Sequence, residues 1–181
     1  MKLLLHTCCA PCSVSVIETL GKENIVPTVY WYNPNIHPYM EYKTRKETLE
    51  EYAKSIGIEA IFEEKYGLKE FCKNTISDLS NRCKKYCYIT RLEKTAKYAK
   101  ENGFDSFSTT LLVSPYQEHE TLKKIGEDLA EKYGINFVYR DFRPGFREGQ
   151  NKARSLGLYM QKYCGCIFSE EERCLPFRDG G

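Results

Sequence analysis

The sequence predicts an α/β fold in which helices flank a single parallel sheet, and three observations support this fold class. Short apolar runs alternate with segments of helical period, which is the pattern of strands joined by crossover helices. A glycine directly follows each of three expected helices, where a left-handed C-terminal cap is favoured: Gly57, Gly103 and Gly134. The length of 181 residues suits one domain, expected to span residues 1–181, and is short for two.

Five strands are expected, each a short apolar run, at residues 2–6, 25–32, 58–62, 104–109 and 136–141. The first helix is expected to begin near Ala10 or Pro11, because proline is favoured in a first helical turn. Apolar residues at helical spacing indicate three later helices: Leu49, Tyr52, Ala53 and Ile56; Ile89, Leu92, Ala96 and Ala99; Leu122, Ile125, Leu129 and Tyr133. The tail is charged and ends in glycines, so we expect it to be frayed from about residue 175.

Three loops are expected to meet at one edge of the sheet, beyond the carboxyl ends of the strands. They carry the segments HTCCAPCS (residues 6–13), YNPNIHP (32–38) and TTLLVSPY (109–116). Because ligands of open parallel sheets bind at this edge, we expect the functional site there.

Composition and charge restrict the partners of the chain. Lys and Arg number 27 against 25 Asp and Glu, a formal charge of +2, so any nucleic-acid-binding face must be local. No apolar run is long enough to span a bilayer, and the apolar start of the chain is too short for a signal peptide. These features predict a cytoplasmic protein with no membrane partner.

The nine cysteines indicate metal binding or redox chemistry, because a reducing compartment disfavours a framework of structural disulfides. Seven of them fall into three short-spaced groups: Cys8, Cys9 and Cys12; Cys83 and Cys87; Cys164 and Cys166. Cys72 and Cys174 have no close cysteine neighbour in the sequence, and we expect them to be ordinary buried thiols.

The first two groups are placed where thiolates can share a ligand. Cys8, Cys9 and Cys12 are expected to cluster at a helix N-terminus, where free N–H groups and the helix dipole favour thiolate over thiol. Cys83 and Cys87 lie four residues apart, so on a helix both would face one ion or cluster.

The third group encloses Gly165, which permits a turn with unusual dihedral angles. Its two thiols could form a strained, easily reduced disulfide or chelate a metal. Seven cysteines exceed the four that close a zinc site, and four could hold an iron–sulfur cluster. The CC and CGC spacings differ from the pairs of zinc ribbons, which favours a cluster while leaving zinc open.

Five motifs in order resemble one known family: HTCCAPC, YNPNIHPYMEYKTR, CYITRLEKTA, STTLLVSPYQ and YMQKYCGCIFS. From Lys2 to about Ser169 the chain resembles the cobalamin-independent epoxyqueuosine reductases, QueH. The resemblance implies a Rossmann-like fold similar to the adenine nucleotide alpha-hydrolases. It also implies the last step of queuosine biosynthesis, the two-electron reduction of epoxyqueuosine to queuosine in the tRNA anticodon loop, with an external electron donor.

The resemblance further implies a [4Fe-4S] cluster and a second metal, expected to be iron. By position, the expected cluster ligands are Cys8, Cys9, Cys83 and Cys87. The expected redox pair is Cys164 and Cys166, and Cys12 is left for a catalytic role near the second metal or the substrate. Many relatives have two residues between the cysteines of the central pair, whereas this chain has three. Thiols also replace the phosphate loop of ATP-using relatives, so activation by ATP is not expected.

Polar residues near the predicted edge are candidates for substrate binding. Asn33 and Asn35 could read the deazaguanine edge, Thr110 and Tyr116 could position hydroxyls, and His37 precedes the pair Glu41 and Arg45. For that pair, a surface ion pair at i, i+4 spacing is an equal alternative.

Residues 140–162 form the candidate tRNA-binding face, with six basic side chains against two acidic ones. Arg143, Arg147 and Lys152 are expected to contact phosphates, and interleaved aromatic residues to stack on unpaired bases. The alternative is a solvated helix face over a few core aromatics.

Two other functions remain open. One is an iron–sulfur-dependent tRNA thiolation enzyme, which would need ATP, and the other is a non-catalytic metal-binding module.

Overall fold

The computed structural model describes residues 1–175, so the end of the tail expected to be frayed lies outside the described residues. Five parallel strands form one sheet in the order β3-β2-β1-β4-β5. They are β1 (Leu3–His6), β2 (Thr28–Trp31), β3 (Ala60–Phe62), β4 (Ser106–Thr109) and β5 (Asn136–Phe137). The expected class, a Rossmann-like parallel sheet with flanking helices, is confirmed.

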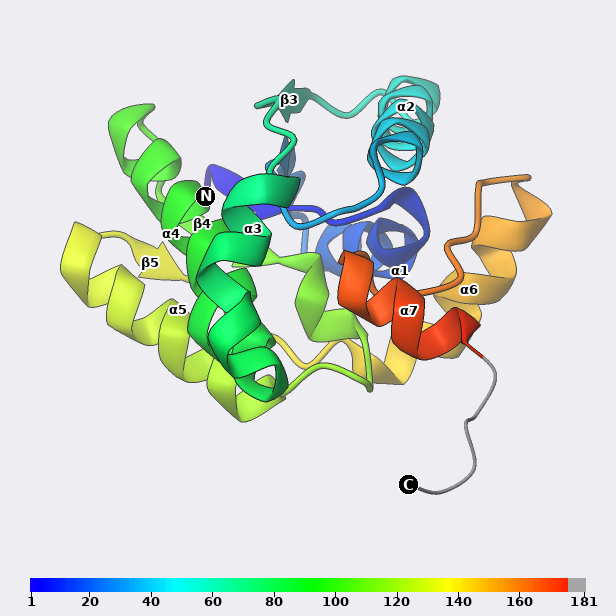
Figure 1. Ribbon diagram of the computed structural model, residues 1–181. Helices are drawn as coiled ribbons and strands as arrows, with labels where there is room; N and C mark the ends of the chain where they lie inside the picture. The colour runs from blue at the N-terminus through cyan, green and yellow to red at the C-terminus, as the bar shows by residue number, and fades with distance from the viewer. Residues whose placement is uncertain (176–181) are drawn as a thin grey trace.

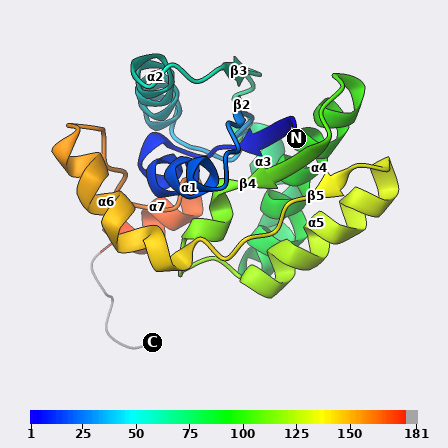
Figure 2. The same cartoon turned by 180° about the vertical axis from the view of Figure 1, so that it is seen from behind.

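Helices cover both faces of this sheet. The α-helices are α1 (Ala10–Lys22), α2 (Tyr39–Ser55), α3 (Leu68–Thr75), α4 (Tyr88–Glu101), α5 (His119–Tyr133), α6 (Phe146–Ser155) and α7 (Ile167–Cys174). Shorter turns are η1 (Ile76–Asn81), η2 (Cys83–Cys87), η3 (Thr110–Val113) and η4 (Arg143–Gly145). Figures 1 and 2 show α1, α2 and α6 on one side of the sheet and α4 and α5 on the other.

Helices α3 and α7 lie apart from these two layers, towards the viewer in Figure 1. They contact each other through Phe71 and Phe168, whose ring centroids are 5.9 Å apart. This small cluster also contains Cys87 and Cys166, so it joins two of the three cysteine groups.

The elements follow from local sequence. β1 is apolar along its length because the central strand is covered on both faces, and Leu3, Leu4 and Leu5 are fully buried. The three expected glycine caps adopt positive φ, at 68°, 69° and 58° for Gly57, Gly103 and Gly134. None of the helices within residues 1–175 is long and apolar enough to cross a membrane.

Several expectations are corrected in detail. β2 begins at Thr28 and β5 ends at Phe137, so both are shorter than their apolar runs. Ile56 and Ile89 are exposed rather than buried, because Ile56 lies past the end of α2 and Ile89 points away from the sheet-facing side of α4. Cys174 is exposed and Cys72 is half-buried, so neither is a fully buried thiol.

A buried histidine ties together three strand ends at the carboxyl edge. His6 ends β1, pairs in register with Thr109 of β4, and its Nδ1 lies 2.9 Å from the Thr109 hydroxyl. Its Nε2 lies 3.2 Å from Oδ1 of Asn33, just past β2. Oδ1 of Asn33 can only accept, so Nε2 carries the ring proton and Nδ1 accepts the hydroxyl proton of Thr109, whose oxygen also accepts the Leu111 N–H.

We expect the free energy of unfolding to fall as pH is lowered from about 6.5 towards 5. Burial lowers the pKa of His6 and that of His37 to about 4. In this window the unfolded chain therefore binds protons that the folded chain excludes. Each histidine that is protonated in the unfolded chain and neutral in the folded chain should lower the free energy of unfolding by about 1.4 kcal/mol per pH unit. Urea unfolding of wild type and His6→Gln measures it, and equal slopes for the two proteins would contradict the assignment.

Candidate metal and redox centre

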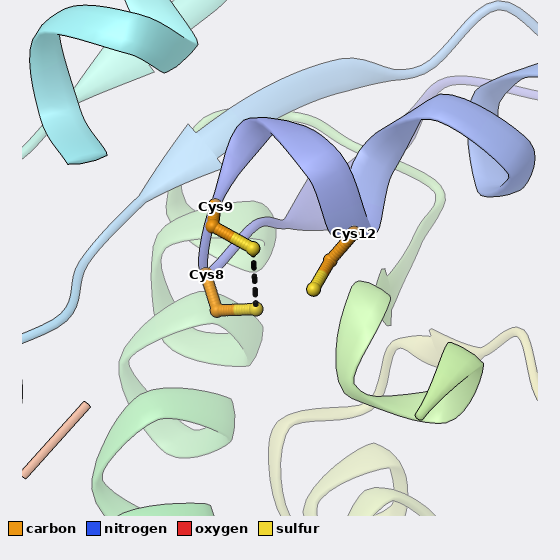
Figure 3. A group of neighbouring side chains, drawn as sticks. All are labelled: Cys8, Cys9 and Cys12. Atoms are coloured by element: carbon orange, nitrogen blue, oxygen red, sulfur yellow. Dashed lines mark hydrogen bonds between the residues drawn. The ribbon is translucent and has the colours of Figure 1, made fainter. Parts of the chain in front are cut away.

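The first cysteine group lies in the loop between β1 and α1. Cys9 is the N-cap of α1 in an extended conformation, and Pro11 occupies the first turn, as expected from the sequence. The sulfurs of Cys8, Cys9 and Cys12 all lie within 4.8 Å of one another. Figure 3 shows the three side chains pointing towards a common point, with Cys12 reaching it from the first turn of the helix. The structure therefore confirms that these three cysteines gather at a helix N-terminus.

The three thiols of this triad differ in the direction of their pKa shifts. Hydrogen bonds with Cys12 and Cys9 hold the pKa of Cys8 well below its usual range. Burial raises the pKa of Cys9, and the bond to Cys8 raises that of Cys12. Metal ligation requires deprotonated thiols, so a metal bound here would release the protons that these sulfurs carry. Three convergent sulfurs at a helix N-terminus fit a metal ion or an iron–sulfur cluster.

The second group lies in a π-helical turn, not in the first turn of an α-helix. Cys83 and Cys87 are the ends of η2, which runs directly into α4. A π-turn accommodates an additional residue in a helix, so the three residues between the cysteines fit without disturbing α4. A hydrogen bond with Cys87 lowers the pKa of Cys83 to about 6 and raises that of Cys87. Cys83 also packs against the core that contains Cys9.

The third group forms a turn around Gly165, whose φ is 153°. A Cβ at this position would lie 3.2 Å from Ile36 and 3.4 Å from a guanidinium nitrogen of Arg45, so the turn needs glycine. Cys164 is exposed, whereas Cys166 is buried and caps α7 by accepting the N–H of Ser169.

Arg45 of α2 holds the backbone of this turn through hydrogen bonds, and we call its contacts, together with those of His37, the clamp. Its Nε donates to Glu41 over 2.7 Å, and its terminal nitrogens donate to the carbonyls of Cys164 (2.8 Å) and Tyr163 (2.9 Å). The side chain of Arg45 is 1% exposed and that of Glu41 is 10% exposed. The alternative of an i, i+4 ion pair is therefore present, but it is buried rather than on the surface.

His37 completes the clamp. Its backbone N–H donates to the carbonyl of Gly165 over 2.7 Å, and its Nδ1 accepts the N–H of Ile167 over 3.3 Å. The hydroxyl of Tyr163 donates to the carbonyl of His37 over 2.6 Å. The YNPNIHP loop is thereby attached to the CGC turn at three points.

The structure places five of the expected substrate residues outside the wall of the cavity described below. All five are buried or nearly so, and the side chains of four of them hydrogen-bond to protein groups: Asn33, His37, Glu41 and Arg45. The Oδ1 of Asn35 is buried without a partner among the described residues. Asn33 therefore supports the β1–α1 loop through the Thr7 carbonyl, and His37 and Arg45 support the backbone of the CGC turn.

A cavity of about 480 Å³ opens where the loops meet. Cys8, Cys12 and Cys164 contribute to its wall, and so do Thr110 and Tyr116, the two remaining expected substrate residues. Its charged lining residues are all cationic: Arg91, Lys162 and Arg173. Tyr116 is 84% exposed at the mouth, where its ring meets the ring of Phe146 edge-on with centroids 6.1 Å apart.

The expected tRNA-binding residues belong to η4 and α6, and α6 contributes Phe146 and Gln150 to the cavity wall. Arg143 belongs to η4 and is paired with Asp141, whereas Arg147 and Lys152 are exposed on α6. Lys152 is paired with Glu18 of α1. Arg147 has no carboxylate within 4.0 Å in the part of the chain that the structure describes.

Sequence reasoning missed Arg91 and Gln161, among other residues of the cavity wall. Arg91 is 3% exposed, lines the cavity, and donates from Nε to the carbonyl of Cys87 over 2.9 Å. Gln161 contacts the first cysteine group, with its Nε2 lying 2.9 Å from the sulfur of Cys9. Both lie within motifs that contain cysteines, and that proximity is the only signal the sequence held for them.

The fold and the site together define a class: a Rossmann-like protein with a thiol-lined cavity at the carboxyl edge of its sheet, suited to metal or redox chemistry. A family model described as epoxyqueuosine reductase QueH matches residues 3–172. The chain belongs to the epoxyqueuosine reductase QueH family and is therefore an oxidoreductase.

Individual relatives agree with this family. The chain is 40% identical to an epoxyqueuosine reductase QueH of Dehalococcoides mccartyi, over 95% of this chain and 94% of that one. It is 36% identical to the protein of that name in Thermotoga maritima, over 94% and 91% of the two chains. A predicted subunit of tRNA methyltransferase from Methanocaldococcus jannaschii has a similar structure, with a TM-score of 0.54 and 14% identity, covering 85% of this chain and 76% of that chain. This last likeness concerns the fold alone.

Replacing Arg45 with Met should destabilise the protein by about 3 kcal/mol, because it leaves a nearly buried carboxylate and two carbonyls without their partner. We also expect faster amide hydrogen exchange in residues 162–166, where the clamp holds the backbone. Lys43→Met on the same helix is the matched control, since Lys43 is exposed and makes only a surface pair with Glu47. Equal stability of the two variants would show that the clamp contributes little.

Proposed function

We propose that this chain reduces epoxyqueuosine to queuosine in tRNA, with an iron–sulfur cluster held by cysteines at the carboxyl edge of its sheet. The observation that carries the proposal is the convergence of Cys8, Cys12 and Cys164, from two distant segments, on one cavity. Membership of the epoxyqueuosine reductase family supports the substrate and the reaction. Because tRNA is the substrate, the proposed place of action is the cytoplasm.

The reaction converts an epoxide, two electrons and two protons into an alkene and one water molecule. Oxidation of the dithiol of Cys164 and Cys166 to a disulfide releases two electrons and two protons, which balances this reaction. An external low-potential donor must then reduce the disulfide. Cys164 is suited to face the substrate because it is exposed in the cavity, whereas Cys166 is buried behind it.

Iron–sulfur clusters are held by four thiolates, and the first cysteine group brings three sulfurs within 4.8 Å of one another while Cys83 packs against the same core. The proposed ligands are Cys8 and Cys9 from the β1–α1 loop and Cys83 and Cys87 from the π-turn. Cys12 shares the first group and would remain for a second metal, proposed to be iron, or for the substrate. When bound, the cluster would supply electrons one at a time.

The cavity suits a nucleotide turned out of the anticodon loop. Its volume is within the range of sites for small molecules and cofactors. Tyr116 and Phe146 at the mouth can stack on neighbouring unpaired bases, and Thr110 can donate to a hydroxyl. A lining with three cations and no carboxylate suits the phosphates of RNA.

The test is anaerobic reconstitution with iron and sulfide, followed by a low-potential reductant and tRNA that carries epoxyqueuosine. Mass spectrometry of the digested tRNA should show queuosine only with the reconstituted protein. A protein that carries an intact cluster but forms no queuosine would refute the proposal. Saturable ATP binding would then favour tRNA thiolation, and stoichiometric zinc without sulfide would favour a metal-binding module.

Two cysteine variants should separate the proposed roles. Cys83→Ala should lose the cluster, because one of four ligands is removed, whereas Cys164→Ala should keep the cluster and lose turnover. Visible absorbance, iron content and queuosine formation measure both effects. Cys174→Ala is the control, since this cysteine is exposed on α7 and outside all three groups. Full activity of Cys164→Ala would remove its redox role.

Arg147→Ala should weaken tRNA binding and reduce the slope of log K against log salt by about 1. The reason is that Arg147 is exposed on α6, which contributes to the cavity wall. Lys124→Ala is a charge-matched control on α5, where Lys124 is exposed and paired with Asp128. Fluorescence anisotropy at several salt concentrations gives both slopes, and identical slopes for the two variants would refute a contact at Arg147.

A further inference from the structure

The Gln161 side chain bridges the segment that leads into the CGC turn and the sulfurs of the β1–α1 loop. Its Nε2 lies 2.9 Å from the sulfur of Cys9 and 3.5 Å from that of Cys12. Its Oε1 is buried and has no hydrogen-bond partner among residues 1–175. Within the same residues, no other side-chain nitrogen bonds to this triad.

The orientation of this amide carries information about the sulfurs. An amide N–H is a donor, and a sulfur accepts it well only when the sulfur carries negative charge. Turning the amide over would present Oε1 instead, which suits S–H groups and repels thiolates. Leaving Oε1 of Gln161 buried without a partner costs free energy, and a strong hydrogen bond from Nε2 to the Cys9 sulfur would offset that cost. A metal-bound sulfur, which has lost its proton, provides that bond.

We propose that Gln161 is a positioning residue that raises the reduction potential of the metal centre held by Cys9, by donating its amide N–H to the Cys9 sulfur. This inference rests on the proposed iron–sulfur centre. Hydrogen bonds to the ligand sulfurs withdraw electron density from them and stabilise the reduced, more negative state. Removing the donor should therefore make the centre harder to reduce.

The backbone around Gln161 is suited to hold such a donor in place. Tyr163 and Cys164, two and three residues further on, are fixed through their carbonyls by Arg45. The donor and the redox turn therefore share one clamped segment. Gln117, another glutamine of the cavity wall, faces Cys164 at 3.5 Å and accepts from the Tyr88 hydroxyl, so it does not contact the triad.

The test compares Gln161→Leu and Gln161→Glu with wild type after reconstitution, by potentiometric titration followed by visible absorbance and electron paramagnetic resonance. At fixed potential, the ratio of reduced to oxidised cluster should fall at least tenfold in the Leu variant, about 59 mV for a one-electron couple. It should fall further in the Glu variant, whose carboxylate repels the sulfur. Gln150→Leu is the matched control, because Gln150 lines the same cavity without a bond to any cysteine. The midpoint potential of the metal centre should be the same in this variant as in wild type.

Turnover provides a second readout that a merely structural role would not give. Gln161→Leu should lose queuosine formation with a mild reductant and keep it with a strong, low-potential one. Unchanged midpoint potentials in both variants, at equal cluster content, would overturn the inference while leaving the proposed function intact. A wild-type protein that binds no cluster would overturn both. Should Gln161→Leu fail to fold, the nearly isosteric Glu variant decides the question.

Discussion

The hydrogen-bonded chain through His6 is the interaction on which the arrangement of the site depends. His6 ends the central strand, and its two ring nitrogens contact groups from the ends of the neighbouring strands, Asn33 and Thr109. Cys8 follows only two residues later, and its N–H contacts the hydroxyl of Thr110 at 3.3 Å. A buried network with satisfied partners rigidifies its surroundings, so the three loops leave the sheet edge in fixed relative positions. The hydrogen bonds at the carboxyl edge of the sheet therefore fix the position of the first cysteine group.

A second constraint fixes the CGC turn, which the sheet alone would not hold. The turn belongs to no strand, yet its backbone is bound by Arg45 of α2 and by His37 of the loop before α2. Polar groups that are buried must find partners, and here they find carbonyls and N–H groups of the turn. The consequence is a division of roles: the YNPNIHP loop and α2 support the site, while β1–α1, η3 and the segment before α7 line the cavity.

The sequence was sufficient for the sheet and for the grouping of the cysteines. Strands buried on both faces appear as apolar runs, and glycine caps mark helix ends, so the α/β class followed from local signals. The short, charged helices α3, α6 and α7 were not predicted, because they span only 8, 10 and 8 residues and bury few apolar side chains; α6, for example, packs through Gly149 against Ser15 of α1. The direction in which a polar side chain points at a sheet edge depends on tertiary contacts that the sequence does not encode locally. Asn33 and Arg45 point into the protein instead of into the cavity, and Gln161 lies in a loop that has no helical or strand period.

The charges around the first cysteine group all favour a centre that accepts electrons. The N-terminus of α1 presents its positive dipole end to Cys9, and Gln161 adds an N–H donor. Arg91 contributes a nearly buried guanidinium on the cavity wall, with no carboxylate within 4.0 Å among the described residues. A buried cation without a counter-charge is unfavourable unless negative charge is nearby, and thiolates with a reduced cluster would supply it. Helix N-termini after a first strand are common sites for phosphate; in this chain that terminus faces three thiols, and under the proposed function it would stabilise electrons on a metal centre.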